Sequence, residues 1–152
     1  MVELADLAAT EAFGHRLGSL LFPGAVIALI GPLGAGKTQL VRAIAEGLGI
    51  RNSRVVSSPT FVLIQEYGAR LPIYHFDTYR LAREQDFVDL GIQEYFESKG
   101  VCLIEWADRV ERSLPAEYLR IVFEVTGETT RRFAVQALGR PYEEIVQKIG
   151  RG

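Results

Sequence analysis

The stretch Gly31-Pro-Leu-Gly-Ala-Gly-Lys-Thr38 decides the fold class that we predict for this chain. It has the form G-x-x-x-x-G-K-T, in which glycines let backbone N–H groups approach phosphates, the lysine reaches the β- and γ-phosphates, and the threonine hydroxyl can bind Mg²⁺. The apolar run Ala25–Ile30 precedes the loop, and residues 38–48 after it have the apolar spacing of a helix. Strand, loop and helix in this order are typical of a phosphate-binding loop.

The start of a helix favours an anion for two reasons. Its first N–H groups have no partner inside the helix, and its dipole places positive charge at this end. The alternative is a glycine-rich turn that happens to contain a lysine. We expect a nucleotide here, and the residues of the loop expected to contact it are Gly31, Leu33, Gly34, Ala35, Gly36, Lys37, Thr38 and Gln39.

Composition limits the classes of protein to consider. The chain has 152 residues, of which 24% are charged and 48% hydrophobic, so we expect one globular domain over residues 1–152. No apolar run has the length of a membrane span and the first residues do not resemble a signal peptide, which predicts a cytoplasmic protein with no membrane partner. The net charge of -2 argues against unaided binding of nucleic acid, so we expect a partner to hold any RNA.

The pattern of apolar residues predicts an α/β fold. We expect a P-loop NTPase-like domain with a mixed, mostly parallel central sheet, flanking helices and antiparallel hairpins. Expected helices cover residues 8–21, 38–48 and a segment from Pro141, and two short helices within 81–100 are separated at Gly91. Expected strands are 25–30, 61–67 paired with 73–77, 101–105, and 119–125 paired with 131–137.

Two carboxylates are candidates for chemistry. Glu105 ends the apolar run that starts at Val101, and parallel strands deliver such an acid to the ligand edge of a sheet. Next to a phosphate loop, it is expected to hold Mg²⁺ or position water. Asp77 shares a strand face with His75, and the sequence leaves open whether Asp77 acts in the site or caps a turn. Trp106 either covers the nucleotide or packs in the core.

Four segments together resemble the TsaE family (formerly YjeE), the bacterial ATPases of tRNA threonylcarbamoyladenosine synthesis. They are the loop at 31–38, Ser58-Pro-Thr-Phe61, His75-Phe-Asp-Thr-Tyr-Arg-Leu81 and Leu103-Ile-Glu-Trp-Ala-Asp-Arg109. The resemblance implies weak ATPase activity and work with TsaB and TsaD, which modify adenosine 37 of tRNA. It also implies that Lys37 and Thr38 bind phosphate and Mg²⁺, that Asp77 and Glu105 are essential acids, that Trp106 lies near the site, and that Thr60 is a switch threonine.

The predicted reaction is hydrolysis of ATP to ADP and phosphate. Lys37, Asp77 and Glu105 are the expected catalytic residues; Thr38 and Glu105 would hold Mg²⁺, and Asp77 would complete the metal shell or orient water. Arg80 and Arg109 are the candidates for an arginine finger, but neither is clearly placed, so we expect slow turnover without a partner. Two alternatives remain: a small-molecule kinase, and a binding module controlled by nucleotide without essential turnover.

Overall fold

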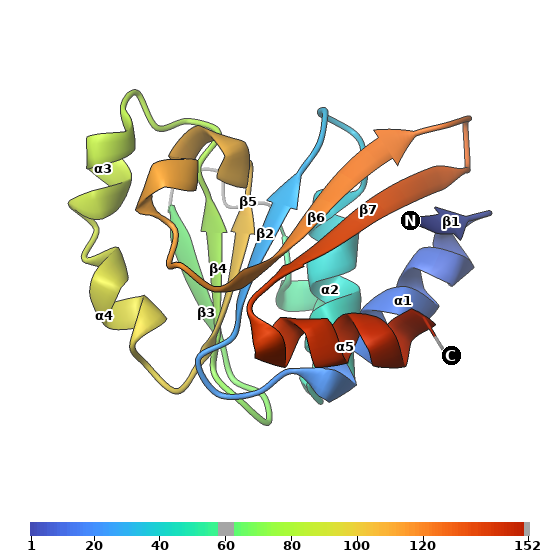
Figure 1. The fold of residues 1–152 in the computed structure, drawn as a ribbon, viewed down its shortest axis with the longest axis horizontal. Coiled ribbons are helices and arrows are strands. Elements are labelled where there is room, and N and C mark those ends of the chain that lie inside the picture. The colour runs from blue at the N-terminus through green and yellow to red at the C-terminus, as the bar shows by residue number, and fades with distance from the viewer. Residues whose placement is uncertain (58–62, 151–152) are drawn as a thin grey trace.

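A seven-stranded mixed sheet forms the centre of the computed structural model, which describes residues 1–57 and 63–150 (Figure 1). The strand order is β1-β7-β6-β2-β5-β4-β3. The strands are β1 (Val2–Leu4), β2 (Val26–Ile30), β3 (Ile64–Tyr67), β4 (Ile73–Asp77), β5 (Val101–Glu105), β6 (Tyr118–Val125) and β7 (Arg131–Leu138). The four central strands β6, β2, β5 and β4 are parallel, which confirms the predicted fold class.

The outer strands pair in the antiparallel sense. β3 pairs with β4, β6 with β7, and the short β1 with β7. Both predicted hairpins are therefore confirmed within the described residues. β2 lies between β5 and β6, with Ala28 opposite Ile104 on one side and Arg120 on the other. A strand with parallel neighbours on both sides and helices on both faces is buried throughout, which explains its unbroken apolar sequence.

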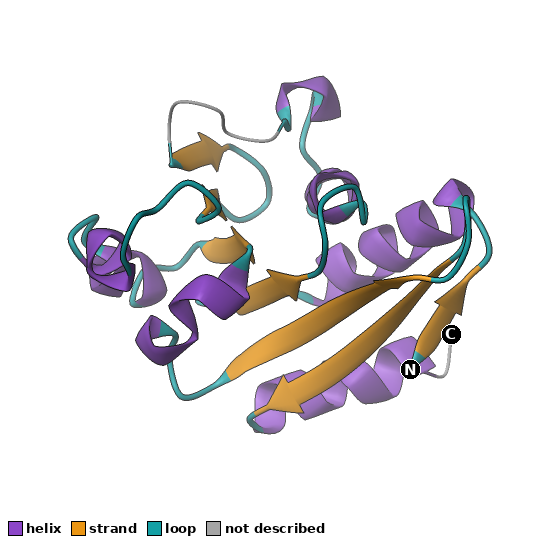
Figure 2. Cartoon of the chain, turned by 90° about the horizontal axis from the view of Figure 1, so that it is seen from above, coloured by secondary structure: helices purple, strands orange, loops and turns teal. Residues whose placement is uncertain are grey.

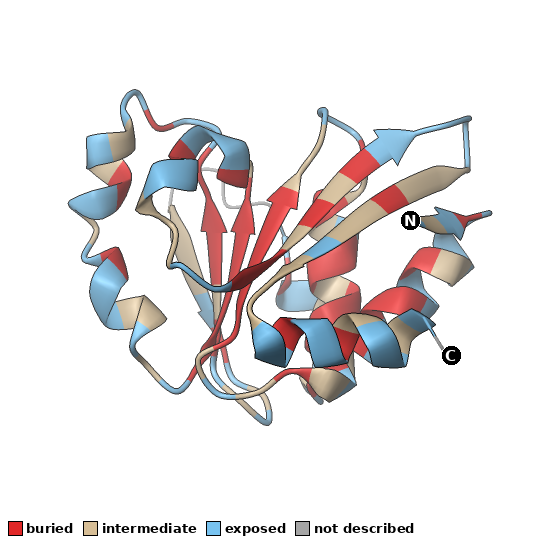
Figure 3. Ribbon diagram, viewed as in Figure 1, coloured by how far each residue is buried: buried red, intermediate tan, exposed pale blue. Residues whose placement is uncertain are grey.

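Helices cover both faces of the sheet (Figure 2). Alternate residues of β2 face the two layers, so Ile27 and Leu29 belong to one core cluster and Val26 and Ala28 to the other. The first layer contains α1 (Leu7–Leu20), α2 (Lys37–Gly47) and α5 (Arg140–Gly150). The second contains α3 (Glu84–Val88), α4 (Ile92–Phe96) and the 3₁₀ helix η2 (Ala107–Ser113), while the 3₁₀ helix η1 (Ser53–Val55) follows α2. Burial is concentrated in the central strands (Figure 3).

Helices α1 and α2 approach each other through glycines. A Cβ atom at Gly14 would lie 2.3 Å from the Cβ of Ala43, and one at Gly18 would lie 2.3 Å from the carbonyl oxygen of Ile44. Only hydrogen fits at these positions without movement of a helix. The helix that follows the phosphate loop is thus supported along its length by the N-terminal helix.

Several expectations agree with the structure and a few do not. Gly91, with φ of 81°, separates α3 from α4 as predicted. The cap of α1 is Asp6, whose side chain accepts from Ala9 N–H at 2.9 Å. Strand β1 and helix η2 were not expected. No helix among the described residues is long and apolar enough to span a membrane.

Candidate active site

The loop from Gly31 to Thr38 connects the carboxyl end of β2 to the start of α2, as its sequence predicts. Two of its glycines, Gly34 with φ of 79° and Gly36 with φ of 97°, adopt the left-handed conformation that a side chain would disfavour. A cavity of about 350 Å³ opens beside the loop. Its lining consists of Leu33, Gly34, Gly36, Lys37, Thr38, Gln39, Glu105, Trp106 and Arg131.

Lys37 is buried against the loop itself. Its Nζ donates to the carbonyl oxygens of Gly31 at 2.7 Å and Pro32 at 2.8 Å, and it lies 3.9 Å from the centroid of the Trp106 ring. Burial lowers the pKa of the ammonium group, and the negative charge of Glu105 is the largest influence in the opposite direction. The ammonium group is therefore fixed within reach of the cavity by two carbonyls and an aromatic face.

Glu105 and Thr38 are brought into direct contact, although they are far apart in the sequence. The Thr38 hydroxyl lies 3.0 Å from each carboxylate oxygen of Glu105 and donates to them. Asp77 ends β4 directly opposite Glu105 in the parallel sheet, so both acids lie at the same edge. Asp77 Oδ1 also accepts from Tyr79 N–H at 2.9 Å. Asp77 thus stabilises a turn and also lies at the sheet edge that carries Glu105.

His75 was not among the expected site residues, yet it touches Glu105. Its side chain is fully buried, and Nε2 lies 2.5 Å from Glu105 Oε2. On the other side of the ring, Nδ1 lies 3.0 Å from the Tyr67 hydroxyl. The strand alternation that places His75 on the same face as Asp77 is the sequence signal for this position.

Trp106 lines the cavity and is held in an uncommon backbone conformation. Its φ of 58° is left-handed, which costs a residue with a side chain about 1–3 kcal/mol. The Thr78 hydroxyl donates toward the carbonyls of Glu105, at 3.0 Å, and Trp106, at 2.7 Å. The rings of Tyr79 and Trp106 pack against each other with centroids 4.7 Å apart and planes tilted by 39°. The backbone turn after β5 therefore presents the indole to Lys37 rather than to the core.

The arginine that lines this cavity is Arg131, which the sequence did not single out. Its Nε donates to Ala35 O at 3.1 Å, joining the start of β7 to the phosphate loop. Arg109 instead donates to the carbonyl of Leu81 at 2.8 Å and lines a separate small cavity, and Arg80 is exposed. Thr60, the expected switch threonine, lies outside the described residues.

The oxygen groups at this site suit Mg²⁺ better than they suit a metal ion whose ligands all come from the protein. No group of three or more His, Cys, Asp or Glu side chains within residues 1–57 and 63–150 forms a metal cage. Mg²⁺ is usually bound by one or two carboxylates, with phosphate oxygens and water completing the octahedron. The Thr38 hydroxyl and the Glu105 carboxylate, already in contact beside a phosphate loop, fit this requirement.

A second cavity, of about 370 Å³, adjoins the first. The two share Gly36, Gln39 and Arg131. The remaining lining residues are Asp6, Leu7, Thr10, Ala35, Glu128 and Thr129. The phosphate loop therefore lies between two hollows, one with Lys37 and Glu105 and one bordered by α1 and the β6–β7 turn.

Comparison with known proteins gives a consistent set of relatives. The family model described as "Threonylcarbamoyl adenosine biosynthesis protein TsaE" matches residues 4–133. The tRNA threonylcarbamoyladenosine biosynthesis protein TsaE of Bacillus subtilis is 44% identical over 143 residues, covering 93% of this chain and 88% of the relative. Its counterpart in Treponema pallidum is 44% identical over 126 residues, covering 83% and 92%. The crystal structure of Bacillus subtilis YdiB aligns with a TM-score of 0.81 at 36% identity, covering 99% of this chain and 93% of that chain.

Proposed function

The chain belongs to the TsaE family, and on this basis we propose that it acts in threonylcarbamoyladenosine modification of tRNA as a Mg²⁺-dependent ATPase. The observation that carries the proposal is the contact between the Thr38 hydroxyl and both carboxylate oxygens of Glu105. It joins the hydroxyl that follows the P-loop lysine to an acid on the neighbouring strand. P-loop ATPases hold Mg²⁺ with this pair of groups.

The phosphates of ATP would lie against the backbone N–H groups of residues 34–38 and the ammonium group of Lys37. This location is supported by the left-handed glycines and by the helix start. The adjoining cavity bordered by Leu7 and Thr10 is large enough to receive the nucleoside. Binding would exchange the bonds from Lys37 to the loop carbonyls for stronger bonds to charged phosphate oxygens.

Mg²⁺, when bound, would neutralise charge on the β- and γ-phosphates. Thr38 and Glu105 would hold it directly or through water, and Asp77 would complete the shell or orient the attacking water. Because phosphoryl transfer depends on position and charge more than on covalent chemistry, these residues supply most of what hydrolysis requires.

Turnover by the chain alone is proposed to be slow. Arg131 donates to the loop backbone, and Arg109 donates to Leu81, so each is engaged in a structural bond. The arginine finger, a positively charged side chain that stabilises the transition state, would be supplied by TsaD- and TsaB-type partner subunits. These partners would also hold the tRNA, which accords with the net charge of -2.

The test is ATP hydrolysis by the chain alone and with the partner subunits. Lys37→Ala is expected to weaken ATP binding about tenfold or more, because a charge-assisted contact is lost. Glu105→Gln should lower kcat more than it weakens binding. Lys148→Ala and Glu111→Gln change the same residue types on the exposed surface and should leave both quantities unchanged. Normal hydrolysis by Glu105→Gln would refute the role of Glu105.

A tRNA modification assay with the partner subunits separates the alternatives. Free phosphate released together with repeated rounds of modification supports the proposal. A phosphorylated metabolite in place of free phosphate would indicate a kinase. Repeated rounds with a non-hydrolysable ATP analogue would indicate a binding module whose turnover is not the working step.

A further inference from the structure

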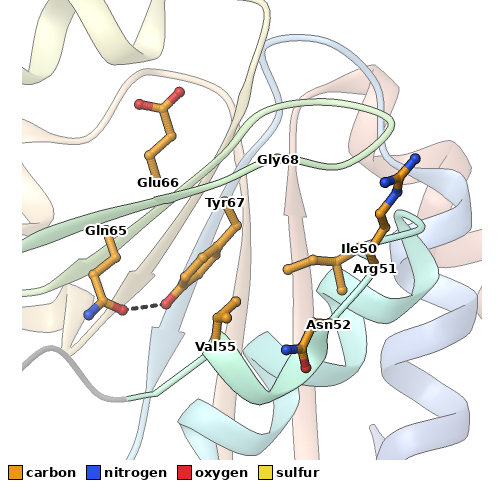
Figure 4. Close-up of a pocket in the computed structure, with 8 residues that line it drawn as sticks. All are labelled: Ile50, Arg51, Asn52, Val55, Gln65, Glu66, Tyr67 and Gly68. Atoms are coloured by element: carbon orange, nitrogen blue, oxygen red, sulfur yellow. Dashed lines mark hydrogen bonds between the residues drawn. The ribbon is translucent and has the colours of Figure 1, made fainter.

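A line of polar side chains runs from a surface cavity to Glu105. The cavity, of about 530 Å³, lies between the loop after α2 and strand β3, away from the phosphate loop (Figure 4). Gln65 and Tyr67 are part of its lining, and the Tyr67 hydroxyl contacts the Gln65 amide. From there the line continues through buried contacts from Tyr67 to His75 and from His75 to Glu105.

The chemistry of the groups sets the direction of these hydrogen bonds. An ionised Glu105 can only accept, so His75 Nε2 carries a proton and donates to it. In a neutral imidazole Nδ1 is then an acceptor, and the Tyr67 hydroxyl donates to it. Burial raises the pKa of Tyr67, so this hydroxyl keeps its proton at neutral pH. The same hydroxyl also contacts Gln65 Oε1, which is a second acceptor for its one proton.

We propose that His75 and Tyr67 are positioning residues that hold the Glu105 carboxylate in the orientation needed for Mg²⁺-dependent hydrolysis. The inference rests on the proposed ATPase function. Glu105 is only 3% exposed, so water cannot readily replace a lost partner. His75 holds Oε2 from inside the sheet while Thr38 approaches from the loop, and together they restrict rotation of the carboxylate. Tyr67 in turn holds the imidazole ring.

Kinetics of variants distinguish positioning from a purely structural role. His75→Leu fills the buried position with an apolar side chain and removes the hydrogen-bond donor to Glu105. It should lower kcat about 10–100-fold, the usual effect of losing a group that orients a metal ligand. The Kd of ADP without Mg²⁺ should change by less than about threefold, because Glu105 does not hold the phosphates. His75→Gln offers an amide N–H near the former Nε2 and should recover most of the lost kcat. Tyr67→Phe should lower kcat by about fivefold.

A measurement without nucleotide gives an independent test. The chain contains two histidines, so a His15→Gln variant identifies which ¹⁵N resonances belong to His75. We expect His75 to carry its proton on Nε2, and Tyr67→Phe to shift the Nδ1 resonance without removing that proton. This readout stands even where His75→Leu fails to fold.

The outcomes separate the two levels of the proposal. An unchanged chain that releases no phosphate, even with its partners, would overturn the ATPase function and the positioning role together. An active chain in which His75 Nε2 carries no proton would overturn the positioning role alone. So would a stable His75→Leu variant with unchanged kcat, or a stable His75→Gln variant as slow as His75→Leu.

Discussion

The glycine contact between α1 and α2 gives a prediction whose sign can be worked out from the structure. In Gly18→Ala, the new Cβ would lie 2.3 Å from Ile44 O and 3.0 Å from Gly47 Cα. Non-bonded contacts normally require about 3.5 Å or more, so the helices must separate by roughly 1 Å. Both obstacles are backbone atoms of α2, which cannot turn aside as a flexible side chain can.

Two effects of the substitution oppose each other. Overpacking a well-packed contact costs about 1–3 kcal/mol. Alanine is better than glycine inside a helix by about 1 kcal/mol. Because the clash at Gly18 is with backbone atoms, the overpacking cost should lie in the upper part of its range. The free energy of unfolding should therefore fall by about 1–2 kcal/mol, with a drop in Tm of about 2–8 °C for a domain of this size.

Urea unfolding followed by circular dichroism measures this difference. Gly68→Ala is the matched control, because a Cβ there would meet no atom within 4 Å and the backbone φ is not left-handed. The control should change stability by no more than about 0.5 kcal/mol. A Gly18→Ala variant as stable as the unchanged chain, or more stable, would show that helix preference outweighs the clash and that the packing argument is wrong.

Three further predictions concern buried groups. Burial raises the pKa of the Cys102 thiol to about 12, so the native chain should resist a thiol reagent at about pH 8, and fast labelling without urea would contradict this. Tyr142→Phe removes the hydroxyl that accepts from Val26 N–H at 2.9 Å, and the loss should be about 1–3 kcal/mol by urea unfolding; no loss would mean that the N–H finds another partner. Burial lowers the pKa of Lys37, so the folded state releases the Lys37 proton at a lower pH than the unfolded chain does. Stability without nucleotide should therefore rise with pH between that pKa and 10.5, and a Lys37→Met variant that keeps the whole rise would exclude Lys37 as its source.

The parts of the fold predicted from sequence are those with strong local signals. The loop ending at Thr38 needs a strand before it and a helix after it, and Glu105 follows an apolar run typical of a parallel strand. Strand β1 has only three residues, too few for alternation to be recognised, and it depends on pairing with β7. Helix η2 likewise lacks a regular apolar period.

The residues that line the candidate site were expected from the sequence where they lay near a motif, and were not expected where they came from other parts of the chain. Arg131 begins the second strand of the C-terminal hairpin, and only the folding of β7 beside the loop places it at Ala35. His75 was placed on the correct strand face, but its contact with Glu105 depends on the register between β4 and β5. Arg109 could not be assigned from sequence because its acceptor, the Leu81 carbonyl, is a backbone atom that any residue could supply.

The position of β2 between β5 and β6 also has a consequence for biosynthesis. The ribosome makes β2 early, but both of its neighbours are made only after at least 70 further residues have been added. Until then the strand Val-Ile-Ala-Leu-Ile has two unpaired edges and an apolar surface, features that promote aggregation of nascent chains. Long-range pairing of this kind is also slow, because the loop must close before the contacts form. The nucleotide loop attached to β2 therefore acquires its binding shape late in synthesis, and a chaperone that shields residues 26–30 should increase the yield of active protein.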